Sequence, residues 1–232
     1  MGGFSLTVAG EGGEVRLWRE YAGDPLRSRY RGYGYQLAYA GVDRDFGALR
    51  LKLSGTMLDE RETILGGGAN MWTGEAGASS WFADAGATYS PGSNWQANAS
   101  YRRGWTRIGA AGLRDQADWL ASDAWSADIT RFGLFSLHDS LALRIAQPLR
   151  VRSGGLNLTL PVGYDYSTLQ ASFGRQFVSL APTGQERDIE AAYAAPVAGG
   201  YLSANAYWRK EPGHIETAAD NVGIALRFTR KF

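Results

Sequence analysis

Apolar residues recur at every second position through most of the chain, which is the period of a β-strand and not the 3.6-residue period of a helix. In "ALRLKLSGTM" (residues 48–57), leucines alternate with arginine, lysine and serine. The same alternation runs through residues 140–151, 155–166 and 222–232. Bulky apolar side chains therefore share one face of each strand, and charged or small ones the other. The pattern predicts an all-β protein.

The segments between these strands alternate in length, which distinguishes one kind of β-protein from another. Short connections are predicted near residues 43–46, 90–93, 136–139 and 196–199, and long ones near 22–32, 59–80, 104–123 and 210–220. Outer-membrane barrels have tight periplasmic turns and long external loops. A soluble sandwich also alternates apolar and polar residues, but this order of connections favours the membrane barrel.

Twelve candidate strands lie at residues 14–21, 33–42, 47–58, 81–89, 94–103, 124–135, 140–151, 155–165, 169–180, 186–195, 200–209 and 222–232. A thirteenth alternating segment, Phe4–Val8, is left over. Either it joins 14–21 as one bent strand through Gly10–Gly13, or the segment 169–180 belongs to an external loop. Backbone polar groups in lipid must all be paired, so the last strand should pair with the first. We expect a closed antiparallel transmembrane β-barrel of about twelve strands, forming a single domain over residues 1–232, with its first strand near residues 3–21.

Composition agrees with this expectation without proving it. The net charge of +1 gives no field that would attract nucleic acid, and the absence of cysteine with only two histidines makes a metal site or cofactor unexpected. The mean hydropathy of −0.28 would suggest a soluble protein, but an alternating barrel also averages near neutral. Rings that flank the apolar runs suit an interfacial girdle: Tyr35, Tyr39, Trp81, Tyr89, Trp95, Tyr101, Trp125, Tyr193 and Trp208.

The chain ends on an apolar alternating strand, "NVGIALRFTRKF". Leu226, Phe228 and the terminal Phe232 resemble the signal by which the outer-membrane assembly machinery recognises barrel proteins. Arg230 stands where an aromatic or aliphatic residue is usual, although an arginine at the membrane boundary can extend its head to water. The start, "MGGFSLTVAGEGGEV", lacks the basic and apolar regions of a signal peptide, so we expect the chain to be part of a longer protein.

A family resemblance follows from blocks in the C-terminal half. The segments "DSLALRIAQPLRVRSGGLNLTLPV" (139–162), "SLAPTGQERDIEAAY" (179–193) and "GGYLSANAYWRKEPGH" (199–214) are similar, in that order, to the translocator domain of autotransporters with a subtilisin-like protease passenger. The resemblance implies a twelve-stranded barrel in the outer membrane of a Gram-negative cell. Its role would be to export and anchor an N-terminal passenger, type V secretion, with the passenger and a pore-inserted linker lying upstream. The enzyme would then be the passenger and not this domain.

The opposite face of the strands would line the pore. The predicted lumen charges are Arg50, Lys52, Arg102, Asp128, Arg144, Arg150, Asp165, Asp188, Glu190 and Arg227. Charges of both signs could create a wet lumen that holds a polar peptide without gripping it. They could also form ion-pair ladders that stiffen the barrel, and this structural interpretation is favoured. Facing lipid, each Arg or Lys would cost about 2–4 kcal/mol at the midplane, which supports the assignment of faces.

A stand-alone barrel is the alternative, either a porin-like channel or a lipid hydrolase. "LHDSL" places His138 and Ser140 two residues apart, and outer-membrane lipid hydrolases use such a pair on a strand. The imidazole would take the hydroxyl proton, and a third group should orient the histidine. The pair lies at a short turn expected on the periplasmic side, where a polar turn is the simpler explanation.

Overall fold

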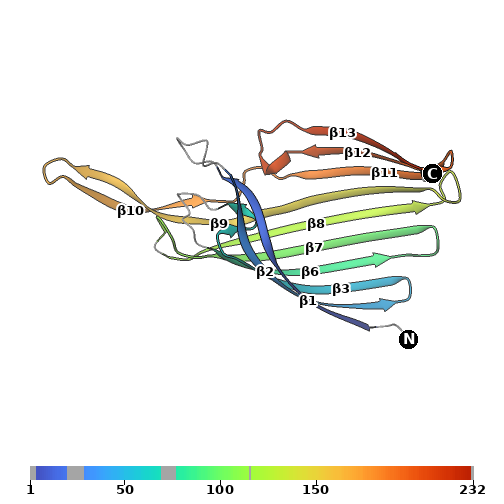
Figure 1. The fold of residues 1–232 in the computed structure, drawn as a ribbon, viewed down its shortest axis with the longest axis horizontal. Helices are drawn as coiled ribbons and strands as arrows, with labels where there is room; N and C mark the ends of the chain where they lie inside the picture. The colour runs from blue at the N-terminus through green and yellow to red at the C-terminus, as the bar shows by residue number, and fades with distance from the viewer. Residues whose placement is uncertain (1–3, 20–28, 69–76, 115, 231–232) are drawn as a thin grey trace.

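The computed structural model describes residues 4–19, 29–68, 77–114 and 116–230. These residues form one antiparallel sheet of eleven strands and a small separate hairpin. The strands of the sheet are β1 (Phe4–Arg19), β2 (Arg29–Phe46), β3 (Leu49–Glu60), β6 (Ala78–Tyr89), β7 (Trp95–Ile108), β8 (Asp118–Phe132), β9 (Ser140–Asp165), β10 (Gln170–Ser179), β11 (Arg187–Val197), β12 (Gly200–Lys210) and β13 (Asn221–Thr229) (Figure 1). The small hairpin joins β4 (Thr63–Ile64) to β5 (Gly67–Gly68), and a 3-10 turn covers Pro212–His214. No helix among these residues is long and apolar enough to cross a membrane.

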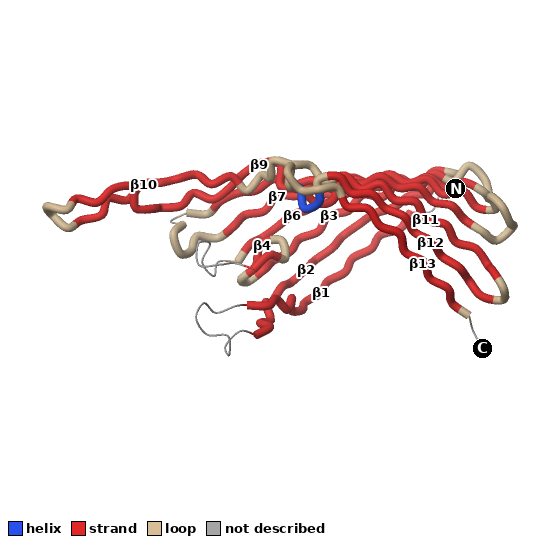
Figure 2. Tube along the Cα trace, turned by 90° about the horizontal axis from the view of Figure 1, so that it is seen from above, coloured by secondary structure: helices blue, strands red, loops and turns tan. Residues whose placement is uncertain are grey.

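Strands that follow one another in the chain pair with two exceptions: β3 pairs with β6 across the small β4–β5 hairpin, and β11 pairs with β9 across the intervening β10. The order begins at β1 and ends at β13, so hydrogen bonds do not close the sheet. The expected pairing of the last strand with the first is thus not formed in this structure. The sheet is strongly curled, and its two edges, β1–β2 and β13, bend toward the same side (Figure 2). The architecture is therefore an open trough with a convex and a concave face.

The strand count differs from the twelve predicted at two places. Residues 140–151 and 155–165 form one strand, β9, of 26 residues, and β10 pairs only with its distal part. This distal part and β10 form a hairpin that projects beyond the sheet (Figure 1), so 169–180 is not a strand of the main sheet path. Gly154, at φ +103°, lies where the register with β8 shifts, which bends β9 without ending it. Phe4–Val8 joins the first predicted strand through Gly10–Gly13 as β1.

The alternation of short and long connections is confirmed where the structure describes them; the long connections predicted near 22–32 and 59–80 lie partly outside the described residues. Two residues, Gly47–Ala48, join β2 to β3, and two, Ala198–Gly199, join β11 to β12. Ala198 and Gly199 both have positive φ, 49° and 72°, as in the type I′ turn that suits the twist of a hairpin. The connections at the opposite end are longer, as in residues 109–117 and 211–220. We call these two ends of the sheet the short-turn end and the long-loop end.

Strand register separates two kinds of side chain onto the two faces. On the convex face, Leu53 of β3 stands opposite Val42 of β2 and Ala85 of β6, and it is 60% exposed. The only cluster of buried apolar side chains among the described residues is small, made of Ile108, Leu120, Leu156 and Leu158 near the long-loop end. The accessible area of 15057 Å² exceeds the roughly 10,000 Å² expected of a compact soluble monomer of 25.2 kDa. Most of the bulky apolar residues therefore lie on an outer surface and not in a core.

Candidate functional site: the concave groove

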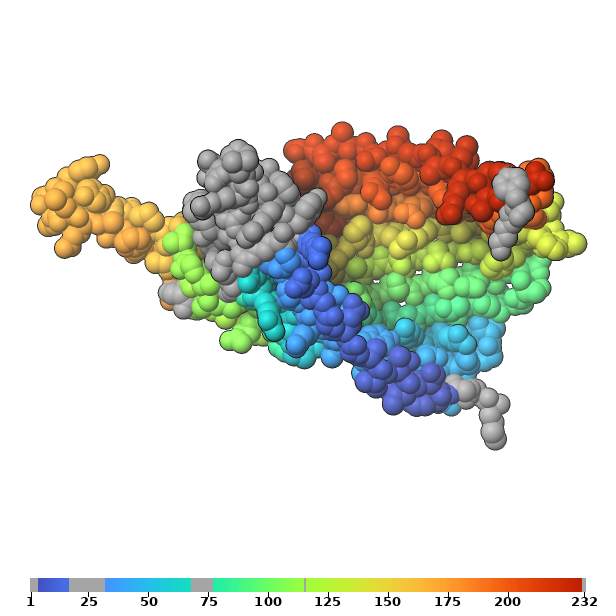
Figure 3. Space-filling view, viewed as in Figure 1, coloured from blue at the N-terminus to red at the C-terminus, as the bar shows by residue number. Residues whose placement is uncertain are grey.

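The concave face encloses a groove of about 1040 Å³ that runs across the strands from β1 to β11. In Figure 3, β1 and the last strands border this hollow on two sides. Apolar side chains such as Leu37, Leu58 and Phe82 line part of it. Polar or charged ones line the rest, among them Lys52, Ser54, Asp84, Arg102 and Asp188. Because each of these residues alternates with an apolar residue on the convex face, the period of two in the sequence builds the groove directly.

Opposite charges pair across neighbouring strands within this groove. Arg102 of β7 forms two hydrogen bonds with Asp84 of β6, at 2.6 and 3.2 Å, and Arg50 of β3 pairs with Asp45 of β2 at 2.6 Å. Arg144 of β9 lies 3.8 Å from Glu190 of β11. These residues stand directly opposite one another in the ladder, so the strand register itself selects the pairs. The charges partly neutralise one another.

Neutral polar groups and an aromatic ring continue this network. Asn98 on β7 donates to Asp128 on β8 at 2.7 Å, and Ser100 and Ser126 are hydrogen-bonded at 2.8 Å. Lys52 lies 5.6 Å from the centre of the Tyr39 ring. Tyr39 was predicted in an interfacial girdle, as was Tyr35, but register places both on the concave side of β2, where Tyr35 donates to Glu11. The two tyrosines share the parity of the polar positions on β2, and aromatic character alone could not reveal this.

Most of the predicted lumen charges do share the concave face. By register and contacts these are Arg50, Lys52, Arg102, Asp128, Arg144, Asp188, Glu190 and Arg227. Asp165 does not: it ends β9 at the tip of the projecting hairpin, where it accepts hydrogen bonds from Ser167. The interpretation of 155–165 as a separate strand of the barrel placed it wrongly.

Arg150 holds a loop instead of facing an open groove. Its guanidinium donates to the carbonyl oxygens of Pro182 at 2.8 Å and Gly184 at 2.9 Å, in the segment before β11. The buried His214 lies beside this segment: its Nδ1 accepts from the backbone of Glu186, and its Nε2 therefore donates to the carbonyl of Leu149. Two long-loop segments are thus fixed to β9, and the sequence offered no signal for this role of His214.

The last strand carries its apolar residues on the convex face. Leu226 and Phe228 of β13 are 72% and 52% exposed, and they stand opposite Ala204 and Leu202 of β12. No strand of the described residues lies beside the other edge of β13. Phe232, the third residue of the predicted assembly signal, lies outside the described residues.

The predicted His138–Ser140 pair lies where the turn after β8 meets the start of β9. His138 is exposed, and in the part of the chain that the structure describes no hydrogen bond joins its ring to Ser140. The buried carboxylate between them, Asp139, accepts hydrogen bonds from the backbone N–H groups of residues 134–136 and from the Tyr193 hydroxyl. Burial works to raise the pKa of Asp139, but these hydrogen bonds outweigh it and lower the pKa below its ordinary value. Asp139 therefore fixes the turn and does not orient the imidazole.

Aromatic residues mark both ends of the convex face. Trp81, Trp105 and Trp119 stand near the long-loop end, and Tyr89 and Trp95 near the short-turn end, all of them exposed. Leu51 and Leu53 of β3, both exposed, lie between the rows that contain Tyr89 and Trp81. Comparisons with protein-family models, with curated proteins and with solved structures found no match for this chain.

Proposed function

We propose that this chain is the translocator domain of an autotransporter, which closes into a barrel in the outer membrane and exports an N-terminal passenger that it then anchors. One observation carries the proposal: the same strands present an exposed apolar band between two aromatic belts on one face and paired charges on the other. Lipid would cover the first face and water would fill the second. The role in exporting a passenger rests on the C-terminal segments that resemble the translocator domains of protease autotransporters.

Closure is part of the proposal. The free edges of β1 and β13 each present backbone groups without a partner strand. In hydrocarbon such groups cost several kcal/mol each, so the two edges gain by pairing. The path from β1 to β13 contains ten strands, and β1 begins at the short-turn end where β13 finishes. If β1 and β13 lay side by side, they would therefore be antiparallel, like the other strand pairs of the sheet.

The pairing of charges in the groove suits a passage better than a binding site. Ion pairs such as Arg102–Asp84 satisfy their charges locally. A polar peptide would meet a wetted surface on which few strong contacts remain to be made. Such a surface allows movement along it, whereas a row of unpaired charges would retain an oppositely charged segment.

The proposal is tested by giving the domain a passenger. The chain is expressed behind a signal peptide and a small reporter domain, and protease is added to intact cells. We expect the reporter to be digested while the barrel migrates as a folded, heat-modifiable species. A reporter that stays protected behind a fully assembled barrel would contradict the translocator role. An unassembled chain would contradict the barrel itself.

A passive channel is the second candidate, and the open groove of about 1040 Å³ favours it. A channel would conduct ions in a planar bilayer whether or not upstream sequence is attached. Conductance that disappears when an upstream linker is restored fits a translocator whose pore is plugged by that linker.

A further inference from the structure

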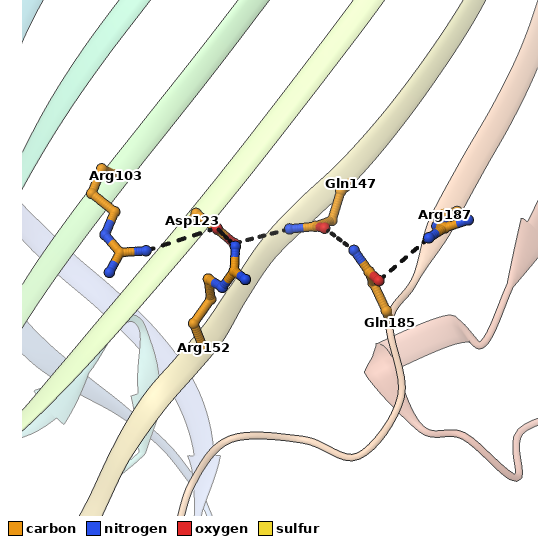
Figure 4. A network of polar contacts seen from close by, with 6 residues as sticks. All are labelled: Arg103, Asp123, Gln147, Arg152, Gln185 and Arg187. Carbon is orange, nitrogen blue, oxygen red and sulfur yellow. Dashed lines mark hydrogen bonds and ion pairs between the residues drawn. The ribbon is translucent and has the colours of Figure 1, made fainter.

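A polar network interrupts the convex face near the long-loop end. It links six side chains (Figure 4): Arg103 of β7, Asp123 of β8, Gln147 and Arg152 of β9, Gln185 of the loop before β11, and Arg187 of β11. Arg103 lies two residues before Trp105 and 6.0 Å from that ring, so it shares the face of the exposed tryptophan. The network is therefore on the side that the proposed function gives to lipid.

The acceptors of this network are buried and already used. Asp123 and Gln147 are 3% and 4% exposed. One oxygen of Asp123 accepts from Gln147 at 3.0 Å, and the other accepts from Arg152 at 2.9 Å and lies 3.8 Å from Arg103. The amide oxygen of Gln147 accepts from Gln185. The buried groups thus fix the positions of the surrounding side chains and have little capacity left.

The arginines, in contrast, have donors to spare. Each guanidinium carries five N–H donors, and Arg152 is 58% exposed although it contacts Asp123. Arg103 and Arg187 are held only by long contacts, of 3.8 and 3.5 Å. Three arginines against one carboxylate leave two positive charges on this patch. Such an excess at a surface that also faces lipid calls for an anion outside the chain.

The level of the patch indicates which anion. Trp105 and Trp119 belong to the aromatic belt of the long-loop end, and such rings lie at the level of the lipid headgroups. Arginine forks match phosphate oxygens in pairs, and basic clusters at this depth bind phosphorylated headgroups. We propose that Arg103, Arg152 and Arg187 form a site for the phosphate of an anionic lipid of the outer leaflet. This inference rests on the proposed membrane location.

The test measures lipid retained by the purified, folded chain. The chain is reconstituted in phosphatidylcholine bilayers that contain either diphosphorylated lipid A or its dephosphorylated form, and bound lipid is measured by native mass spectrometry. The variant carries Arg152→Gln with Arg187→Gln, which leaves Arg103 to accompany Asp123. We expect the unchanged chain to prefer the phosphorylated lipid, and the variant to bind it roughly tenfold or more weakly.

Arg131→Gln supplies the matched control. Arg131 also lies beside an exposed tryptophan, 5.0 Å from the Trp95 ring, but at the short-turn end and outside the network. It should keep the preference. Three results would overturn the lipid site. The chain could retain phosphorylated and dephosphorylated lipid A equally, the double variant could bind as well as the unchanged chain, or inorganic phosphate could displace the lipid fully. A chain that fails to insert at all would overturn the proposed membrane function as well.

Discussion

The two faces of strand β3 carry opposite chemistry one residue apart. Leu53 is 60% exposed on the convex face, and its neighbour Lys52 lies in the concave groove against the ring of Tyr39. Both side chains are exposed, whereas a leucine that alternates with a lysine in a water-soluble sheet is usually the buried residue of the two. The difference is the one expected if, as proposed, lipid covers the convex face and water fills the groove.

The sharpest way to break this comparison is to exchange the chemistry of one face. We expect Leu53→Arg to cost about 2–4 kcal/mol, because a cation would face the middle of the lipid layer. Thr56→Arg on the same strand points into the groove and should cost much less. Assembly is measured by heat-modifiable migration and the free energy of unfolding in lipid. Equal effects of the two variants would show that the convex face does not meet lipid.

A smaller effect is expected at the turn that joins β8 to β9, where Asp139 lies. Hydrogen bonds lower the pKa of Asp139, so its stabilisation is complete above the ordinary aspartate pKa and is lost as pH falls through the lowered value. Unfolding midpoints measured from neutral to acid pH should therefore decline less in Asp139→Asn, which is less stable at neutral pH. Asp165→Asn is the control. The Ser167 hydroxyl also lowers the pKa of Asp165, but its hydrogen bonds lie within the tip of the projecting hairpin, so we expect the unfolding midpoint of the sheet to keep its pH profile. Parallel pH profiles for Asp139→Asn and the unchanged chain would contradict this role.

The smallest effect is expected inside the groove. Asp84 and Arg102 are both partly exposed, so a double-mutant cycle with alanine should give a coupling of about 0.2–1 kcal/mol that falls with added salt. Arg102→Ala alone should cost more than Asp84→Ala, since the guanidinium also lies 5.1 Å from the Phe82 ring. A salt-independent coupling of several kcal/mol would mean that the groove is dry, and the contrast between the faces would then fail.

How far the sequence predicts this fold depends on the regularity of each strand. In β3, β6 and β7 the period of two assigned side chains to faces correctly, because register with the neighbours is unbroken. In β9 it failed, because the shifts opposite residues 121–125 add residues that alternation cannot show. Asp165 was misplaced for a different reason: β9 continues past the sheet into the projecting hairpin, and alternation does not show where a strand leaves the sheet.

The candidate sites divide in a similar way. Charged positions such as Lys52 and Arg144 were found because each lies between apolar neighbours in its own strand. The network around Asp123 was missed, since it joins β7, β8, β9 and the loop before β11, and no local spacing relates those segments. In the sequence, Asp139 is marked only by its place between His138 and Ser140. The fold of the turn shows that its carboxylate accepts hydrogen bonds from the backbone.

The order of the strands has a consequence for how the protein forms. Most pairings join consecutive segments of the chain. Each strand can therefore pair with the one before it at little cost in loop-closure entropy. The contact of β9 with β11 is different, because the chain must first travel out along the projecting hairpin and return. We therefore expect the pairing of β9 with β11 to be the slow step of assembly. Strands β11, β12 and β13 should then join the sheet together.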